Sequence, residues 1–138
     1  MNARLSAAVV GVGMLMAVVP VLAHHSFAAE FDANKPITLR GTLTKMEWVN
    51  PHGWLHLDVK GPDGKVVNWG VEAGGPNALL RRGLRKEDFP IGTELIVEGF
   101  QAKNGSPNMN GRTVKLPDGR NFFLESSGNG APRESAEK

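Results

Sequence analysis

The sequence predicts an all-β fold with small helical content: a five-stranded OB-like β-barrel with one short helix between strands 3 and 4. Two observations support this fold class. Apolar and polar residues alternate in short segments that are separated by glycine- and proline-containing turns. A single helical segment follows the third strand and precedes the last two. An open meander capped by the helix is the alternative arrangement.

The first three strands are predicted at residues 37–49, 54–61 and 66–73. In each of them apolar residues alternate with polar ones, as in a half-buried strand. Gly41 marks a bulge or a bend in the first strand. The Pro-Asp-Gly-Lys turn at 62–65 joins the second strand to the third as a hairpin.

The second half of the chain changes period. A short helix is predicted within residues 74–89, with Gly83 at the position where a helix end favours a positive φ. A fourth strand follows at 92–102, and then a long polar loop at 103–111. The last strand, or strand pair, covers 112–124 around a second Pro-Asp-Gly turn.

The inward-facing apolar residues of these elements make up one predicted core. Its members are Leu39, Leu43, Leu55, Leu57, Val59, Val67, Trp69, Val71, Leu79, Leu95 and Val97.

Residues 1–23 have the pattern of a cleavable signal peptide. Arg4 supplies the positive charge, a long uncharged apolar run follows, and the run ends in Val21-Leu22-Ala23, which suits a signal peptidase. An uncleaved membrane anchor is the alternative, since the run approaches the ~20 residues that span a bilayer. The pattern therefore predicts a periplasmic or secreted protein without a transmembrane span after cleavage.

After cleavage three segments are expected. Residues 24–36 form an N-terminal arm that Phe27 and Phe31 attach to the body, residues 37–124 form the domain, and residues 125–138 form a disordered polar tail.

The charge balance argues against nucleic acid as a partner. Without Arg4 the chain has 15 Lys plus Arg against 14 Asp plus Glu, a net charge of +1. It contains no cysteine, which excludes disulfides and thiol redox chemistry. The sequence indicates a monomer that depends on packing alone.

The histidines raise the possibility of a metal site. Cleavage after Ala23 would give His24 a free α-amine beside its own imidazole, and these two nitrogens chelate Cu(II) well when a further imidazole joins them. His25, His52 and His56 are the other donors. In a straight strand His52 and His56 would lie ~13 Å apart, too far for one ion. A solvated, polar His-His pair is the alternative.

Aromatic and polar residues gather in the first three strands. Trp48, Asn50 and Trp54 are the candidates for an exposed ligand-binding patch, because strands 2 and 3 carry the usual ligand surface of OB-type folds. The alternative is that these tryptophans plug the ends of the fold.

No catalytic motif is present. The chain lacks G-x-S-x-G, H-E-x-x-H and a glycine-rich phosphate loop, and no spacing pairs its strand carboxylates. The sequence therefore predicts that the protein is not an enzyme.

Four blocks of sequence carry a resemblance: "AHHSFAAEFD", "ITLRGTLTKMEWVNPHGWLHLDV", "NWGVEAGGPNALLRRG" and "GTELIVEGFQAKNGS" with "LPDGR". Together, over roughly residues 24–123, they resemble a family of small exported bacterial proteins known only as a domain of unknown function. The resemblance implies an exported OB-like domain and implies no activity.

The first functional hypothesis is an exported, non-catalytic module that binds an unknown ligand. A periplasmic copper-binding protein that uses His24 is the alternative, and an envelope component that binds other proteins is the third option.

Overall fold

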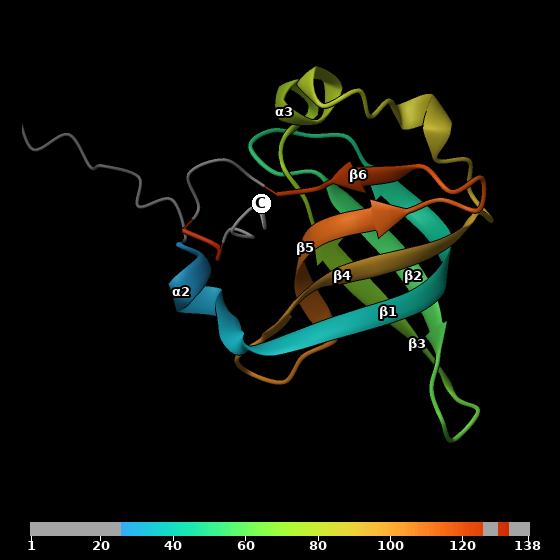
Figure 1. Cartoon of the computed structure of the whole chain (residues 1–138). Coiled ribbons are helices and arrows are strands. Elements are labelled where there is room, and N and C mark those ends of the chain that lie inside the picture. Colours follow the sequence, from blue (N-terminus) through green and yellow to red (C-terminus); the bar gives the residue numbers. More distant parts are fainter. Residues whose placement is uncertain (1–25, 126–129, 133–138) are drawn as a thin grey trace, which may run out of the picture.

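The computed structural model describes residues 26–125 and 130–132 (Figure 1). The predicted signal peptide, His24, His25 and most of the predicted C-terminal tail lie outside these residues. Within the described ranges, no helix has the length and apolar character that crossing a membrane requires.

Within the described residues the chain forms six strands, two short α-helices and one 3-10 turn. In chain order these are α2 (Phe27–Glu30), β1 (Phe31–Glu47), β2 (Trp54–Lys60), β3 (Val66–Glu72), α3 (Pro76–Arg81), η1 (Lys86–Asp88), β4 (Glu94–Ala102), β5 (Asn108–Lys115) and β6 (Asn121–Phe123).

The strands form one sheet in the order β3-β2-β1-β4-β5-β6, and a parallel pairing of β3 with β5 closes it into a ring. All other neighbours are antiparallel. The helix α3 follows the third strand, so the predicted OB-like order is confirmed. The sixth strand arises because the C-terminal segment folds as a hairpin of β5 and β6.

Two strands begin earlier than predicted. β1 starts at Phe31 rather than at residue 37, because Phe31 pairs with Ala102 and Pro36 with Phe100 across an irregular stretch of register. β5 starts at Asn108 rather than at residue 112, so the predicted polar loop is shorter. The asparagines of this segment disfavour a strand, but its pairing with strands on both sides overrides that preference.

Local signals explain the turns. Gly64 and Gly83 both have positive φ, 80° and 83°, at the β2–β3 hairpin and at the end of α3, as the sequence predicts.

The bulge in β1 lies between Leu43 and Lys45 and exchanges the faces of the strand. At Gly41 the backbone of β2 comes so close that a Cβ atom would lie 2.7 Å from the Asp58 carbonyl oxygen.

The predicted core is confirmed for eight buried members, which are Leu39, Leu43, Leu55, Leu57, Val71, Leu79, Leu95 and Val97. Val59 and Trp69 are only partly buried and pack against this core. The second half of the chain adds residues that the prediction missed: Leu84, Phe89, Met109, Val114, Leu116 and Leu124.

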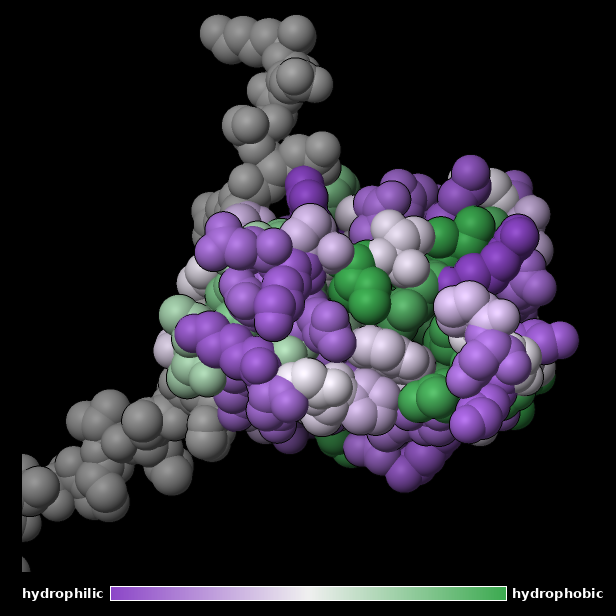
Figure 2. Space-filling view, turned by 90° about the horizontal axis from the view of Figure 1, so that it is seen from below, coloured by the Kyte–Doolittle hydropathy of each residue, from purple (hydrophilic) through white to green (hydrophobic). Residues whose placement is uncertain are grey.

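The prediction for Val67 is wrong, because its side chain is 44% exposed. β3 pairs with β5 only from Gly70 onward. The first half of β3 therefore pairs with β2 on one edge and, within the described residues, has no strand on its other edge. Seen from the end opposite α3, hydrophobic side chains gather in the middle of the face, with hydrophilic residues around them (Figure 2).

A second apolar cluster lies beside the ring, where α2 leads into the beginning of β1 (Figure 1). Phe27 and Phe31 are each 4% exposed and pack with Phe100 and Ala102. The Phe27 and Phe100 rings pack edge to face, with their centroids 5.4 Å apart. The predicted attachment of the N-terminal arm by Phe27 and Phe31 is therefore confirmed.

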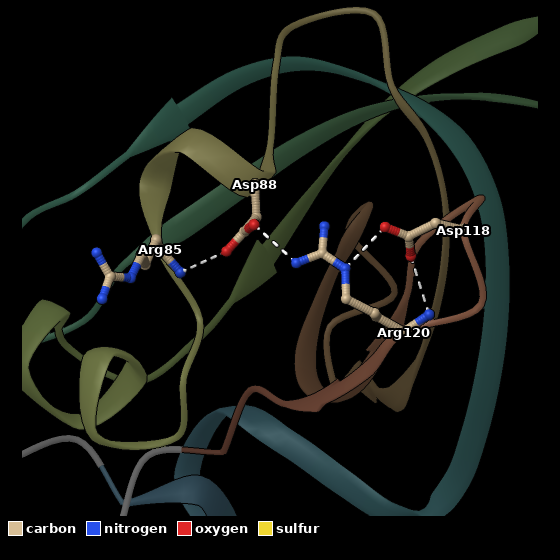
Figure 3. Close-up of polar contacts among 4 residues, drawn as sticks. All are labelled: Arg85, Asp88, Asp118 and Arg120. Atoms are coloured by element: carbon tan, nitrogen blue, oxygen red, sulfur yellow. Dashed lines mark hydrogen bonds and ion pairs between the residues drawn. The ribbon is translucent and has the colours of Figure 1, made fainter.

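A network of ion pairs joins η1 to the β5–β6 turn (Figure 3). Arg120 donates to Asp88 Oδ1 at 2.8 Å and to Asp118 Oδ2 at 2.7 Å, and the Arg85 backbone N–H donates to Asp88 Oδ2 at 3.0 Å. The Arg120 guanidinium, followed by the Arg85 amide, lowers the pKa of Asp88. The Arg120 backbone N–H, followed by its side chain, lowers the pKa of Asp118.

We expect Leu57→Ala to lower the free energy of unfolding by about 2–5 kcal/mol, because it leaves a cavity in a fully buried site. Val67→Ala is the control and should change it by no more than about 0.5 kcal/mol, since Val67 is exposed. Thermal and urea denaturation measure both. Equal losses for the two variants would contradict the assigned strand faces.

We expect the Asp88–Arg120 pair to make stability depend on pH. A carboxyl group whose pKa is lowered on folding stabilises the fold above its ordinary pKa of ~3.9, and that stabilisation is lost as the pH falls through the folded value. Asp88→Asn should therefore destabilise the protein at pH 7, with a smaller difference from wild type near pH 2. Glu87→Gln, an exposed neighbour on the same turn, is the matched control. Urea denaturation at several pH values would detect a pH-independent difference, which would contradict this role.

Candidate functional site

The site begins with the outward face of β2. Leu55 and Leu57 point into the core, so alternation turns Trp54 and His56 to the opposite face. Trp54 pairs with Glu47 of β1 on one side and with Glu72 of β3 on the other. This face therefore carries an indole between two carboxylates.

A pocket of about 290 Å³ lies beside Trp54. It is formed by three parts of the chain: the N-terminal helix and start of β1, the outward face of β2, and the segment from the end of β4 to the start of β5. The lining residues are Ala29, Glu30, Phe31, Trp54, Ala102, Lys103, Asn104, Ser106 and Asn108.

Gly70 allows Trp54 and Asn108 to approach each other. A Cβ atom at this position would lie 2.5 Å from Asn108 Oδ1 and 3.5 Å from the Trp54 ring. Gly70 pairs with Asn108 in the parallel contact that closes the ring, and its N–H donates to the Pro107 carbonyl at 2.9 Å. The pocket therefore lies where the ring closes.

Short polar contacts fix the loop between β4 and β5. The Ser106 N–H donates to Asn104 Oδ1 at 2.9 Å, and Asn108 Nδ2 donates to Ser106 Oγ at 3.1 Å. The Lys103 N–H donates to the Glu30 carbonyl at 2.9 Å, and the Lys103 ammonium donates to the Ala28 carbonyl. These bonds hold the loop to α2 and orient its amide and hydroxyl groups at the pocket.

Each described histidine faces a different carboxylate. His52 Nδ1 lies 3.3 Å from Glu72 Oε1, and His56 Nε2 lies 3.3 Å from Glu47 Oε1. Both nitrogens are buried and meet the carboxylates at ion-pair distance without hydrogen-bond geometry. Each contact is an ion pair only when its imidazole is protonated.

The structure does not test the copper hypothesis, because His24 and His25 lie outside the described residues. Among residues 26–125 and 130–132, no three His, Asp or Glu side chains are grouped as metal ligands. His52 meets the Glu72 carboxylate, and His56 meets the Glu47 carboxylate. The hypothesis thus depends on His24 and stays a prediction.

The three residues of the predicted aromatic patch do not line the same pocket. Trp48 is partly buried and packs against the core. Asn50 is exposed in a loop, where its Oδ1 lies 3.0 Å from the position of a Cβ on Gly75. Only Trp54 of the three lines the pocket.

The sequence prediction missed the polar lining residues Lys103, Asn104, Ser106 and Asn108, and two buried polar residues beside the pocket. Glu72 and Asn110 are buried, at 8% and 2% exposure, and form a register pair next to Trp54. Asn110 Oδ1 has no hydrogen-bond partner among the described residues. The signal available in the sequence was the polar stretch at 103–111, since asparagine and serine in a loop beside a sheet often mark a binding site.

We expect Lys45→Met to raise the pKa of Glu47. The hydrogen bond from the Lys45 ammonium is the main cause that lowers this pKa, and the charge of His56 adds to it. Removing the ammonium should return the pKa toward its ordinary value. Carboxyl ¹³C NMR titration measures the shift, with Lys60→Met on β2 as the charge-matched control. An unchanged Glu47 titration in Lys45→Met would contradict the contact.

Comparison with known proteins places the chain in a family. No curated protein and no solved structure matches it. A family model matches residues 12–111, which confirms the resemblance inferred from the sequence blocks. Because the match covers more than half of the chain, the protein belongs to the family described as a family of unknown function (DUF6152).

Proposed function

We propose that this protein is an exported, non-catalytic binding module that holds a small ligand in the pocket beside Trp54. The observation that carries the proposal is the pocket itself, about 290 Å³ with one aromatic wall and several polar groups. This volume is at the lower end of small-molecule sites, and an apolar wall with few polar groups is their usual composition.

The location of the pocket supports the proposal. Ligands of OB-type folds bind the face of strands 2 and 3 and the loops between strands 1 and 2 and between strands 4 and 5. Here Trp54 comes from β2, and Asn104 and Ser106 come from the β4–β5 loop. The likeness to OB-type folds supports this location by analogy, beside the chemistry of the lining residues.

The titratable groups at the pocket favour binding over catalysis. Glu30 and Lys103 are the titratable side chains among the lining residues, and both are exposed. Water screens such groups, whereas general acid–base catalysis favours titratable side chains that are partly buried in a cleft. The predicted signal peptide supports export to the periplasm or the medium.

We expect a small molecule to shift backbone and indole NMR signals of the pocket residues in the exported protein. A panel of glucose, adenosine, alanyl-alanine, inorganic phosphate and spermidine covers neutral, anionic and cationic chemistry. At millimolar concentration at least one member should shift the Trp54 Nε1–H signal together with the amides of residues 103–108. The Trp69 Nε1–H signal is the internal control, because Trp69 packs against the core.

No shift at these positions with any member of the panel would contradict the proposal. Shifts confined to other surfaces would contradict the assigned site.

A further inference from the structure

We infer that the Trp54 pocket binds a neutral carbohydrate, with one face of a pyranose ring stacked on the indole. This inference rests on the proposed function and names its ligand class. The pocket joins an aromatic surface to groups that donate and accept hydrogen bonds, and a sugar ring presents the complementary pair: an apolar C–H face and a rim of hydroxyls.

The aromatic wall is held in place. Trp54 is half-buried on the outward face of β2. The Cβ position of Gly70 lies 3.5 Å from the Trp54 ring and 2.5 Å from Asn108 Oδ1, so the Asn108 amide lies beside the indole where a larger residue at position 70 would stand. The negative face of an aromatic ring attracts the slightly positive C–H groups of a ligand. Because Trp54 lines the pocket and is only half-buried, the exposed part of its indole can contact one sugar ring.

The polar wall suits hydroxyl groups. Asn104 and Asn108 have amides, and Ser106 has a hydroxyl, so each side chain is both donor and acceptor. Asn104 Oδ1 accepts from the Ser106 backbone, and Ser106 Oγ accepts from Asn108. These two bonds use neither the Asn104 amide nitrogen nor the Ser106 hydroxyl hydrogen, so both lining residues keep a donor for a ligand. Sugar hydroxyls, which also donate and accept, can pair with both.

The charges of the pocket select neither anions nor cations. Glu30 and Lys103 offset each other, and the Lys103 ammonium already donates to the Ala28 carbonyl. Recognition of a phosphate or of a polyamine normally uses several charges of one sign. A neutral ligand therefore fits the balance of the lining.

A nucleobase fits less well than a sugar. Proteins often hold a flipped or single-stranded base between two stacking groups. The other aromatic residue of the lining, Phe31, is 4% exposed and lies in the cluster with Phe27, at 5.9 Å between ring centroids. It therefore offers no second stacking face, and adenosine is the appropriate comparison ligand.

The test is a titration of the exported protein with glucose, N-acetylglucosamine and maltose, and with adenosine in parallel. NMR follows the Trp54 Nε1–H signal and the side-chain amides of Asn104 and Asn108. We expect at least one saccharide to shift all three, with a dissociation constant in the millimolar range, as the small size of the ligand implies. Adenosine should bind at least about fivefold more weakly.

Variants locate the contact. Trp54→Ala should weaken saccharide binding about tenfold or more, since removing an aromatic stacking platform has an effect of this order for bases. Trp54→Phe keeps an aromatic face and should restore part of the affinity. Trp69→Phe is the matched control and should bind as wild type.

A second variant tests the polar wall while Trp54 is kept. Gly70→Ala places a methyl group 2.5 Å from Asn108 Oδ1, so the amide must move. Saccharide binding should fall, and a thermal melt shows whether the variant is folded. Ser106→Ala removes the hydroxyl without this crowding, and should weaken binding as well.

Three results would overturn the inference. Shifts by adenosine or another non-sugar without any by saccharides would leave a binding module of another ligand class. Saccharide binding that Trp54→Ala leaves unchanged would place the sugar elsewhere. No response to any compound, including the wider panel, would overturn both the ligand class and the proposed function.

Discussion

The parallel pairing of β3 with β5 closes the sheet, and both the core and the pocket depend on it. It consists of three residue pairs, Gly70–Glu72 with Asn108–Asn110. Without these pairs the sheet would have two free edges and an open apolar face. The same pairs set Gly70 beside Asn108, and thus bring Trp54 to the start of β5. One short contact therefore completes the hydrophobic core on the inside and creates the pocket on the outside.

The pocket also depends on the N-terminal segment. The cluster of Phe27, Phe31, Phe100 and Ala102 holds α2 beside the ring, and the two backbone-directed bonds of Lys103 join α2 to the β4–β5 loop. Burial of this aromatic cluster stabilises an element too short to form alone, since a four-residue helix is unstable in water. The wall of the pocket is thus built by tertiary packing and not by local helix preference.

Much of the ring could be predicted from the sequence, because alternation at Leu55 and Leu57 and the glycine at 83 report local conformation directly. The closing contact could not be predicted, since the segment that contains Asn108 and Asn110 has the composition of a loop and becomes a strand only between two neighbours. Val67 was misassigned for the same reason: its alternation fits a core strand, and its exposure depends on where the partner strand begins. Trp54 could be identified from the sequence, because alternation places it on the outward face of β2. Glu72 and Lys103 could not, because their places beside the pocket depend on the pairing of β3 with β5 and on the shape of the β4–β5 loop.

The division of β3 has a consequence for local motion. From Gly70 onward the strand has neighbours on both sides, whereas Val66–Trp69 pair with β2 alone. In a strand the backbone groups of alternate residues point to the same side, and Gly70 donates toward β5, so the N–H groups of Val66 and Asn68 point to the free edge. Amide hydrogens at a free edge exchange with solvent faster than those inside a ladder. The hairpin end of β3 is therefore held by fewer backbone hydrogen bonds than the pocket end of the same strand.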